Sequence, residues 1–144
     1  MFKKRDVRVL PEPDASTQFY WEAAARRELA ILRCRGCRSF VHYPREDCPK
    51  CGSKELAPER VSGRGTIHSF TIAHHGGAGL PTPLALVLVE LEEQKGLRVL
   101  ANLLDCPLDE VKVGMPVEVT FEDVGEGVTL PQFRPRQPLR QPNG

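Results

Sequence analysis

The sequence lacks the features that would mark a membrane protein, a secreted protein or a common hydrolase. No run of 18 apolar residues occurs in the 144-residue chain, so we expect no transmembrane helix. The basic start, MFKKRDVRVLPEPDA, has no apolar core of about 7–15 residues behind it, so we expect no secretory signal. A Gly-rich phosphate loop before a helix, a GxSxG motif and an HExxH motif are also missing. The sequence therefore offers no recognised catalytic motif.

Aromatic residues are scarce, at 6% of the chain with a single Trp, yet three of them are consecutive. They are Phe19, Tyr20 and Trp21. The alanine-rich segment that contains them predicts a helix over about residues 17–31. Two interpretations of the cluster stay open. The rings either pack the helix onto its own domain or form a docking surface for another protein, where aromatic residues are enriched.

Charge is balanced overall but unevenly distributed. The net charge of +1 combines +4 over residues 1–60, −6 over residues 61–130 and +3 over residues 131–144. The middle region is acidic enough to repel a phosphate backbone. We therefore do not expect this protein to bind nucleic acid.

The strongest motif is CRGCRSFVHYPREDCPKC, which holds two CxxC pairs separated by ten residues. Two such knuckles supply four sulfurs to one tetrahedral ion, and we predict one structural zinc. The predicted ligands are Cys34, Cys37, Cys48 and Cys51. Four protein ligands leave no open position for water or substrate, which argues against hydrolytic chemistry. Iron, as in a rubredoxin, remains the rival metal, and a metal assay distinguishes the two.

The remaining candidate residues in and near this motif are interpreted as structural. His42 lies inside the ribbon but is not needed as a ligand, so we expect a packed or surface histidine. Cys106 has no nearby partner and is expected to be a small buried apolar residue. Because four of the five cysteines fall in the metal pattern, we expect reduced thiols and a cytoplasmic location.

Residues after the cysteine motif predict five short strands. The run LALVLVELEE has no clean alternation and predicts a strand buried on much of both faces. PVEVTFEDV alternates, so Val117, Val119 and Phe121 are predicted to face inward. Five strands with a connection after the third suit the OB fold. The predicted class is mainly β: an N-terminal helix, a rubredoxin-like zinc ribbon and a five-stranded OB-fold barrel.

The same stretches support a family resemblance over about residues 16–135. FYWEA, CRGC, YPREDCPKCGS, SGRGTIHSFT, ALVLVEL, VLANLLD, VGMPVEVTFEDV and LPQFRP occur in that order. The chain resembles the rubredoxin-like zinc-ribbon plus OB-fold family associated with acyl-CoA enzymes. The expected units are an arm and helix (1–33), a zinc ribbon (34–60), the barrel (61–134) and a flexible tail (135–144).

The resemblance implies a non-catalytic subunit that completes a thiolase-fold enzyme and its CoA channel. Among the partners that the resemblance implies, a β-oxoacyl-CoA thiolase ranks first. A steroid side-chain aldolase and a hydroxymethylglutaryl-CoA synthase/thiolase complex are the alternatives. A single-stranded nucleic-acid-binding OB module is the alternative from another class.

One loop, AHHGGAGLPTP, keeps three interpretations open. It could be a hairpin connection, a loop that touches CoA or the partner, or the site of a catalytic histidine. The candidate residues are His74, His75, Gly76 and Gly77. The glycines would let a ligand or partner approach the backbone closely.

Overall fold

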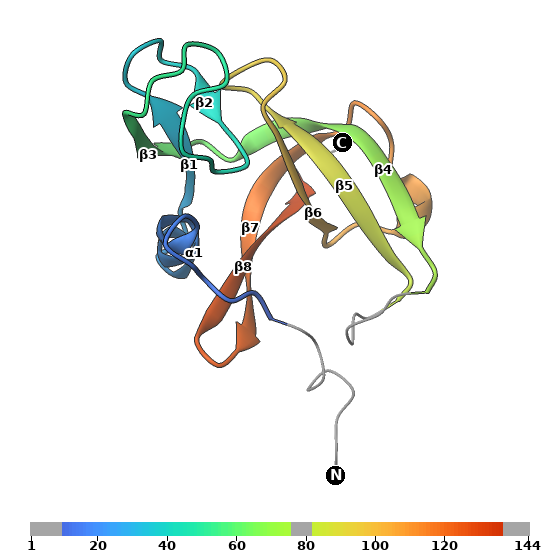
Figure 1. Ribbon diagram of the computed structural model, residues 1–144. Helices are drawn as coiled ribbons and strands as arrows, with labels where there is room; N and C mark the ends of the chain where they lie inside the picture. Colours follow the sequence, from blue (N-terminus) through green and yellow to red (C-terminus); the bar gives the residue numbers. More distant parts are fainter. Residues whose placement is uncertain (1–9, 76–81, 137–144) are drawn as a thin grey trace.

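The computed structural model describes residues 10–75 and 82–136, and within them one α-helix precedes two antiparallel β units (Figure 1). The elements are α1 (Gln18–Ala25), β1 (Leu29–Cys34), β2 (Phe40–Val41), β3 (Leu56–Val61), β4 (Arg64–Ala73), β5 (Leu84–Leu91), β6 (Arg98–Leu103), the 3-10 helix η2 (Leu108–Glu110), β7 (Pro116–Gly125) and β8 (Val128–Pro135). In this described part of the chain, no helix is both long enough and apolar enough to cross a membrane.

Helix α1 is shorter than predicted, because it ends at Ala25 and does not reach residue 31. The chain leaves it through Arg27, whose φ of 64° lies in the left-handed region. The N–H groups of Arg27 and Glu28 bond back to carbonyls of the last helical turn at 2.9 Å, which is a Schellman-type ending. The next residues then form β1, whose pairing with β3 outweighs their local helix propensity.

The ribbon is a three-stranded antiparallel sheet in the order β2-β1-β3. Strand β1 pairs with β3 along its whole length, from Leu29 opposite Val61 to Cys34 opposite Leu56. Because β1 is apolar and lies in the centre of this sheet, nearly all of its residues are buried. The first metal-binding cysteine is thus placed at the end of a rigid central strand.

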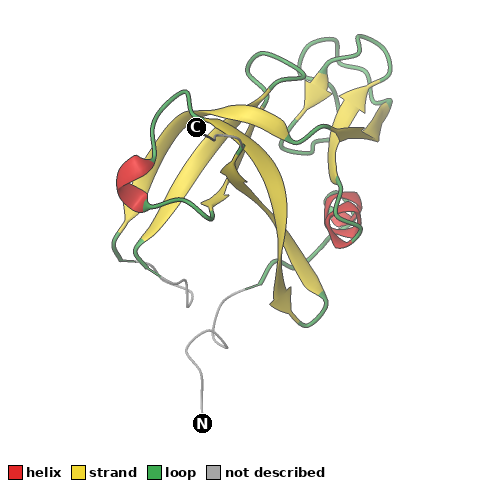
Figure 2. Ribbon diagram, turned by 180° about the vertical axis from the view of Figure 1, so that it is seen from behind, coloured by secondary structure: helices red, strands yellow, loops and turns green. Residues whose placement is uncertain are grey.

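The second unit is a closed barrel with strand order β4-β5-β6-β8-β7, closed by pairing of β7 with β4. Neighbours are antiparallel except β6 and β8, which run parallel where Leu103 is opposite Phe133. This is the strand order of a five-stranded Greek-key barrel, so the predicted fold class is confirmed. Figure 2, from behind, shows the strands of the barrel curving together and α1 lying below the ribbon.

The barrel interior is an apolar core to which every barrel strand contributes. Strand β5 is buried at five of its eight residues and half-buried at the other three, as its unbroken apolar run predicts. Two glycines of the SGRG stretch allow the strands to close tightly. A Cβ on Gly63, whose φ is +81°, would overlap the Val119 side chain, and one on Gly65 would overlap the Glu90 carbonyl.

Strand β7 departs from the predicted alternation. Val117 is fully buried and Val119 packs against the core, but Phe121 is half-buried and lies outside the core cluster. The β7–β8 hairpin extends beyond the part of β7 that pairs with β4, which ends at Glu118. Arg27 holds this extension from the side, donating to the Phe121 carbonyl at 3.1 Å and to Asp123 at 2.9 Å.

Candidate metal centre and the surfaces around it

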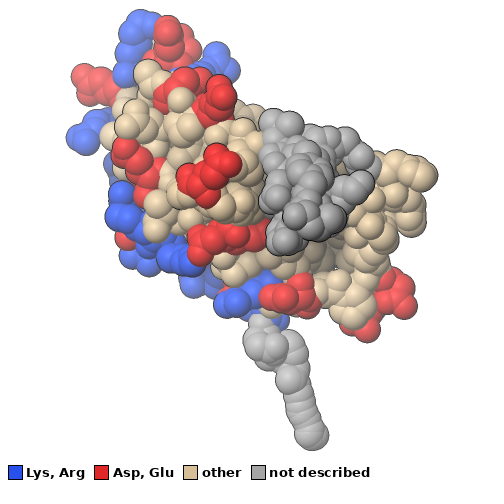
Figure 3. Space-filling model, turned by 90° about the horizontal axis from the view of Figure 1, so that it is seen from below, with Lys and Arg blue, Asp and Glu red and all other residues tan. Residues whose placement is uncertain are grey.

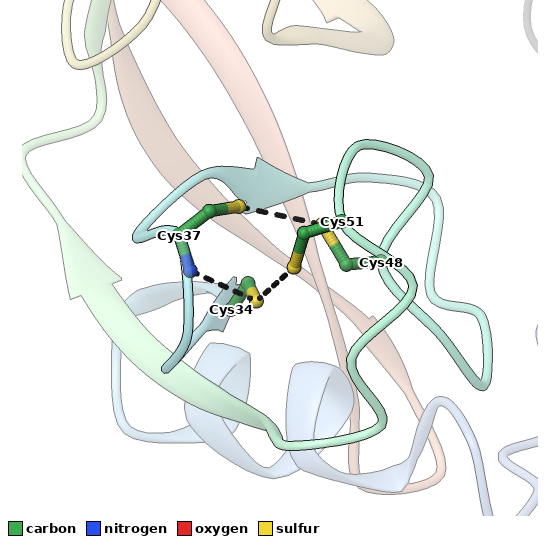
Figure 4. A group of neighbouring side chains, drawn as sticks. All are labelled: Cys34, Cys37, Cys48 and Cys51. Carbon is green, nitrogen blue, oxygen red and sulfur yellow. Dashed lines mark hydrogen bonds between the residues drawn. The ribbon is translucent and has the colours of Figure 1, made fainter.

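The metal centre is built from two knuckles with the same backbone geometry (Figure 4). In each, the N–H of the first cysteine, Cys34 or Cys48, bonds a carbonyl five residues later at 2.8 Å. The residue after the second cysteine is Arg38 in one knuckle and Gly52 in the other, with φ values of 69° and 78°. Both donate back to the carbonyl of the first cysteine at 2.9 Å. This left-handed turn brings both sulfurs of a knuckle to one side.

The four sulfurs form a compact cluster that fits one tetrahedral ion. All four lie within 4.8 Å of one another. Sulfur–sulfur distances are 3.5 Å between Cys34 and Cys51 and 3.6 Å between Cys37 and Cys48. A tetrahedral ion with metal–sulfur bonds of about 2.3 Å requires edges of about 3.8 Å, so only small shifts are needed. Four sulfurs complete such a coordination shell and leave no position for a reacting water.

Hydrogen bonds to the sulfurs favour the thiolate form in the first knuckle. The backbone N–H of Cys37 points at the Cys34 sulfur and lowers the pKa of that thiol. Hydrogen bonds from the side chain and backbone of Ser39 lower the pKa of Cys37 to about 6. Although a backbone N–H from Ser53 acts in the opposite direction, the crowded sulfurs raise the pKa of Cys51 to about 11. A divalent cation sharing the charge of all four sulfurs removes this conflict.

The cysteine cluster packs on a small group of apolar side chains that is distinct from the larger core of the barrel. The buried residues of this group and the side chains packed on them are Leu32, Cys34, Val41, Cys48, Phe19 and Leu56. The two first cysteines of the knuckles are buried, whereas the two second cysteines are exposed. The metal site thus joins an apolar half to a solvent-facing half, while Leu29, Ile31 and Phe40 of the ribbon pack into the larger core shared with the barrel.

The three aromatic residues of α1 face three different surroundings. Phe19 packs on the small apolar group of the cysteine cluster, and Tyr20 packs on the barrel core and stacks on His42 with ring centroids 5.9 Å apart. Burial lowers the pKa of His42 to about 4 and raises the pKa of Tyr20. Trp21 meets Tyr20 edge-on at 5.0 Å. Packing of the helix onto its own domain therefore accounts for Phe19 and Tyr20, and His42 is the packed histidine that the sequence predicts.

An apolar pocket of about 190 Å³ opens beside Trp21, where the helix, the ribbon and the barrel meet. Its lining residues are Thr17, Tyr20, Trp21, His42, Tyr43, Pro44, Val99 and Leu100. Two of its large side chains are unusually exposed, Tyr43 at 62% and Leu100 at 55%. The sequence does not predict that Tyr43 and Leu100 line one pocket, because Tyr43 lies in the ribbon loop and Leu100 lies on strand β6 of the barrel.

The histidine loop is only partly described. His74 and His75 are exposed and follow β4 directly, whereas Gly76 and Gly77 lie outside the described residues. Neither histidine belongs to the cysteine cluster. Cys106 is half-buried against the barrel core, and this burial raises the pKa of its thiol, which fits the predicted structural role.

The barrel surface offers little to a nucleic acid. Of the three barrel phenylalanines, Phe133 is fully buried, Phe121 is half-buried and Phe70 is 37% exposed, so a row of stacking platforms is not formed. On the face in Figure 3, acidic side chains lie beside basic ones over the described part of the surface. Basic side chains on the barrel are also paired, as Arg64 with Glu92 and Arg98 with Glu90.

Two family models match consecutive parts of the chain. Residues 21–57 match the rubredoxin-like zinc ribbon domain of ChsH2, and residues 58–122 match the C-terminal OB-fold domain of ChsH2. The chain therefore carries a zinc ribbon whose four cysteines cluster to hold one metal ion.

Relatives among known proteins are scaffold proteins and subunits of acyl-CoA enzymes. A DUF35 domain-containing scaffold protein of Methanocaldococcus jannaschii is 32% identical, over 74% of this chain and 77% of its own length. The benzoylsuccinyl-CoA thiolase subunit BbsA of Thauera aromatica is 30% identical, over 73% of each. A probable enoyl-CoA hydratase alpha subunit of Thermomonospora curvata is 35% identical over 96% of this chain, which spans 43% of that relative's length.

A solved structure agrees with both the fold and these relatives. One chain of the Ltp2-ChsH2(DUF35) aldolase superposes with a TM-score of 0.80 at 35% identity, covering 88% of this chain and 98% of that one.

Proposed function

This chain belongs to the DUF35 family, in which a ChsH2-type zinc ribbon is joined to an OB fold, and from that premise we propose that it is a scaffold subunit of an acyl-CoA enzyme. The partner is a thiolase-fold protein, first of all a β-oxoacyl-CoA thiolase. The partner breaks and forms the bonds, and this chain completes the assembly and the CoA channel. A cytoplasmic location fits its reduced, metal-binding cysteines.

The observation that carries this proposal is the coordination of the metal. Four cysteine sulfurs saturate a tetrahedral ion, so the metal fixes the shape of the ribbon and takes no substrate. The similarity to the thiolase subunit BbsA extends over 73% of each chain. It supports a subunit role for this chain as well.

Two surfaces are proposed to meet the partner and its substrate. The helix and ribbon form one docking unit, with the exposed parts of Phe19, Tyr20 and Trp21 and the apolar pocket beside them. The barrel forms the second unit, and its loop from His74 onward lies near the CoA. Exposed aromatic side chains beside an apolar pocket are typical anchors of protein interfaces.

An aldolase partner is a second candidate, favoured by the superposition on the Ltp2-ChsH2(DUF35) aldolase chain at a TM-score of 0.80. Thiolases and aldolases of this kind would both use a scaffold of the same shape. The two candidates therefore differ in the chemistry of the partner and not in the role of this chain.

The proposal is tested by purifying the tagged chain from its native host and quantifying bound proteins by mass spectrometry. A thiolase-fold protein at a molar ratio near one supports the scaffold role. Turnover of that complex then separates the candidates, since thiolysis consumes free CoA whereas a retro-aldol cleavage does not. A chain that purifies alone, or with nucleic acid, contradicts the proposal.

A further inference from the structure

Strand β4 closes the barrel with only its first three residues. Arg64, Gly65 and Thr66 pair with β7, whereas β4 pairs with β5 from Gly65 to Ala73. A β-bulge at His68 separates the two parts, and bulges bend a strand away from its neighbour. Figure 1 shows β4 and β7 together at the top of the barrel and far apart below. Beyond Thr66, no strand among the described residues covers this edge of β4.

The backbone of this edge has no other partner in the described residues. The last bonds along it join Ile67 to Met115 and Gly114, at 3.0 and 2.8 Å. From Ser69 to Ala73, β5 is the single segment of residues 10–75 and 82–136 that pairs with the backbone of β4. Strands β6 and β8 are also paired at few positions. There, however, the buried Gln132 side chain accepts a hydrogen bond from the backbone N–H of Asn102 at 2.8 Å, so this N–H has a partner.

The side chains of the free edge do not protect it. The segment HSFTIA, residues 68–73, contains no charged residue and no proline, and most of its residue types favour strands. Residues 68–71 are exposed, including Phe70 at 37%. Soluble proteins normally guard an edge strand with lysine, proline or a covering segment, because unpaired N–H and C=O groups recruit other strands.

We propose that the free edge of β4, Ser69–Ala73, is a docking site that an extended segment of the partner subunit joins as an additional strand. This rests on the proposed scaffold function and adds the place and the mode of contact. A row of backbone donors and acceptors is complemented by another backbone, so the occupant is an extended peptide and not a small ligand. The uncharged edge selects an equally uncharged segment with no proline over about five residues.

Three other occupants of this edge are conceivable: two segments of the chain itself and a second copy of it. The chain's own residues 137–144, QPLRQPNG, contain two prolines and are poorly suited to a strand. Its own residues 1–9 have none, and a variant lacking them tests that occupant directly. A second copy of the chain would make a concentration-dependent dimer.

The test is hydrogen exchange of the full-length chain, alone and in complex with the co-expressed thiolase-fold subunit of the same host. The proposal predicts that those amides of Ser69–Ala73 that do not bond to β5 exchange at least about tenfold more slowly in the complex. Unchanged exchange in an intact complex overturns the edge site and leaves the scaffold function standing. Failure of any complex to form overturns both. Slow exchange in the free monomer that is lost on deleting residues 1–9 also overturns it.

Two matched variants test whether the edge contributes to binding. Thr71 and Thr66 are both exposed threonines of β4, but Thr66 lies where β7 already covers the edge. Thr71→Lys places a charge on the free edge and is expected to weaken the complex at least about tenfold. Thr66→Lys adds the same charge and should leave affinity within about twofold. Equal effects of the two contradict the proposal, as does a dimer of the free chain that Thr71→Lys dissociates.

Discussion

The side-chain amide of Gln94 pairs with both backbone groups of Phe40, accepting from its N–H at 2.8 Å and donating to its carbonyl at 3.2 Å. Gln94 lies between β5 and β6 of the barrel, and Phe40 begins β2 of the ribbon. The glutamine thus continues the ribbon sheet as a strand neighbour would. Arg27, which follows α1, donates hydrogen bonds to the β7–β8 hairpin. These bonds and the Gln94 contact hold the helix and the ribbon against the barrel at two separate points.

Removing the Gln94 amide should destabilise the chain. Gln94→Ala leaves a partly buried N–H and carbonyl of Phe40 without their partner, at an expected cost of about 1–3 kcal/mol in the free energy of unfolding. The neighbouring exposed Lys95→Ala is the control and should change stability by less than about 0.5 kcal/mol. Both are measured by urea denaturation, and indistinguishable curves would show that the contact does not couple the two units.

Two glycines with the same backbone angle separate steric overlap from backbone strain. Gly63 has a φ of +81° and no room for a Cβ because of Val119, whereas Gly96 has a φ of +83° and nothing within 4 Å. Both Gly→Ala variants incur strain of about 1–2 kcal/mol. Gly63→Ala should lose about 1–3 kcal/mol more than Gly96→Ala because the barrel closure must open to admit the methyl group. Equal losses would show that the closure is not tightly packed.

Zinc content should depend on the cluster and not on the fifth cysteine. Cys48→Ser removes a buried ligand, and we expect the purified chain to lose its single zinc, since coupled binding and folding supplies about 10–16 kcal/mol to such a ribbon. Cys106→Ser should retain one zinc per chain. The measurement is elemental analysis together with limited proteolysis of the ribbon. Iron in the wild-type chain, or full zinc in Cys48→Ser, would contradict the assignment.

Burial of His42 should make stability sensitive to mild acid. Its pKa is about 4 in the folded chain against 6.5 when exposed. Between these values the unfolded chain binds a proton that the folded chain does not, so stability is complete above pH 6.5 and falls as the pH drops towards 4. The limiting loss is about 3 kcal/mol.

The cysteine cluster also titrates in acid, so the His42 contribution is read as a difference. Unfolding free energies of the wild type and His42→Phe are compared between pH 4 and 7. The stability of the wild type relative to His42→Phe should rise as the pH increases from 4 to 6.5 and then stay constant. An NMR titration that gives His42 an ordinary pKa would remove the basis of this expectation.

Local motifs made much of the structure predictable. The two CxxC pairs define their own turns, so the four ligands could be read from spacing alone, and the apolar run of β5 identified a strand covered on both faces. These features depend on residues close together in the chain, where sequence carries the most information.

Features that depend on distant contacts were not predictable. The residues of β1 have helix-forming composition, and their pairing with β3 and β2 makes them a strand and ends α1 at Ala25. Gln94 is 54 residues from Phe40, and nothing near either residue signals their pairing. The free edge of β4 likewise arises from the bulge at His68 and the departure of β7, neither of which has a local pattern.

We propose that this chain gives its partner a surface and not a reacting group. The most direct measurement is the kcat of the reconstituted complex with the wild-type chain and with the double variant His74→Ala/His75→Ala, the two exposed histidines after β4. We expect values within a few-fold of each other, a difference of about 1 kcal/mol or less in the barrier. A loss of about a thousandfold, roughly 4 kcal/mol, would contradict it and place a catalytic histidine on this chain.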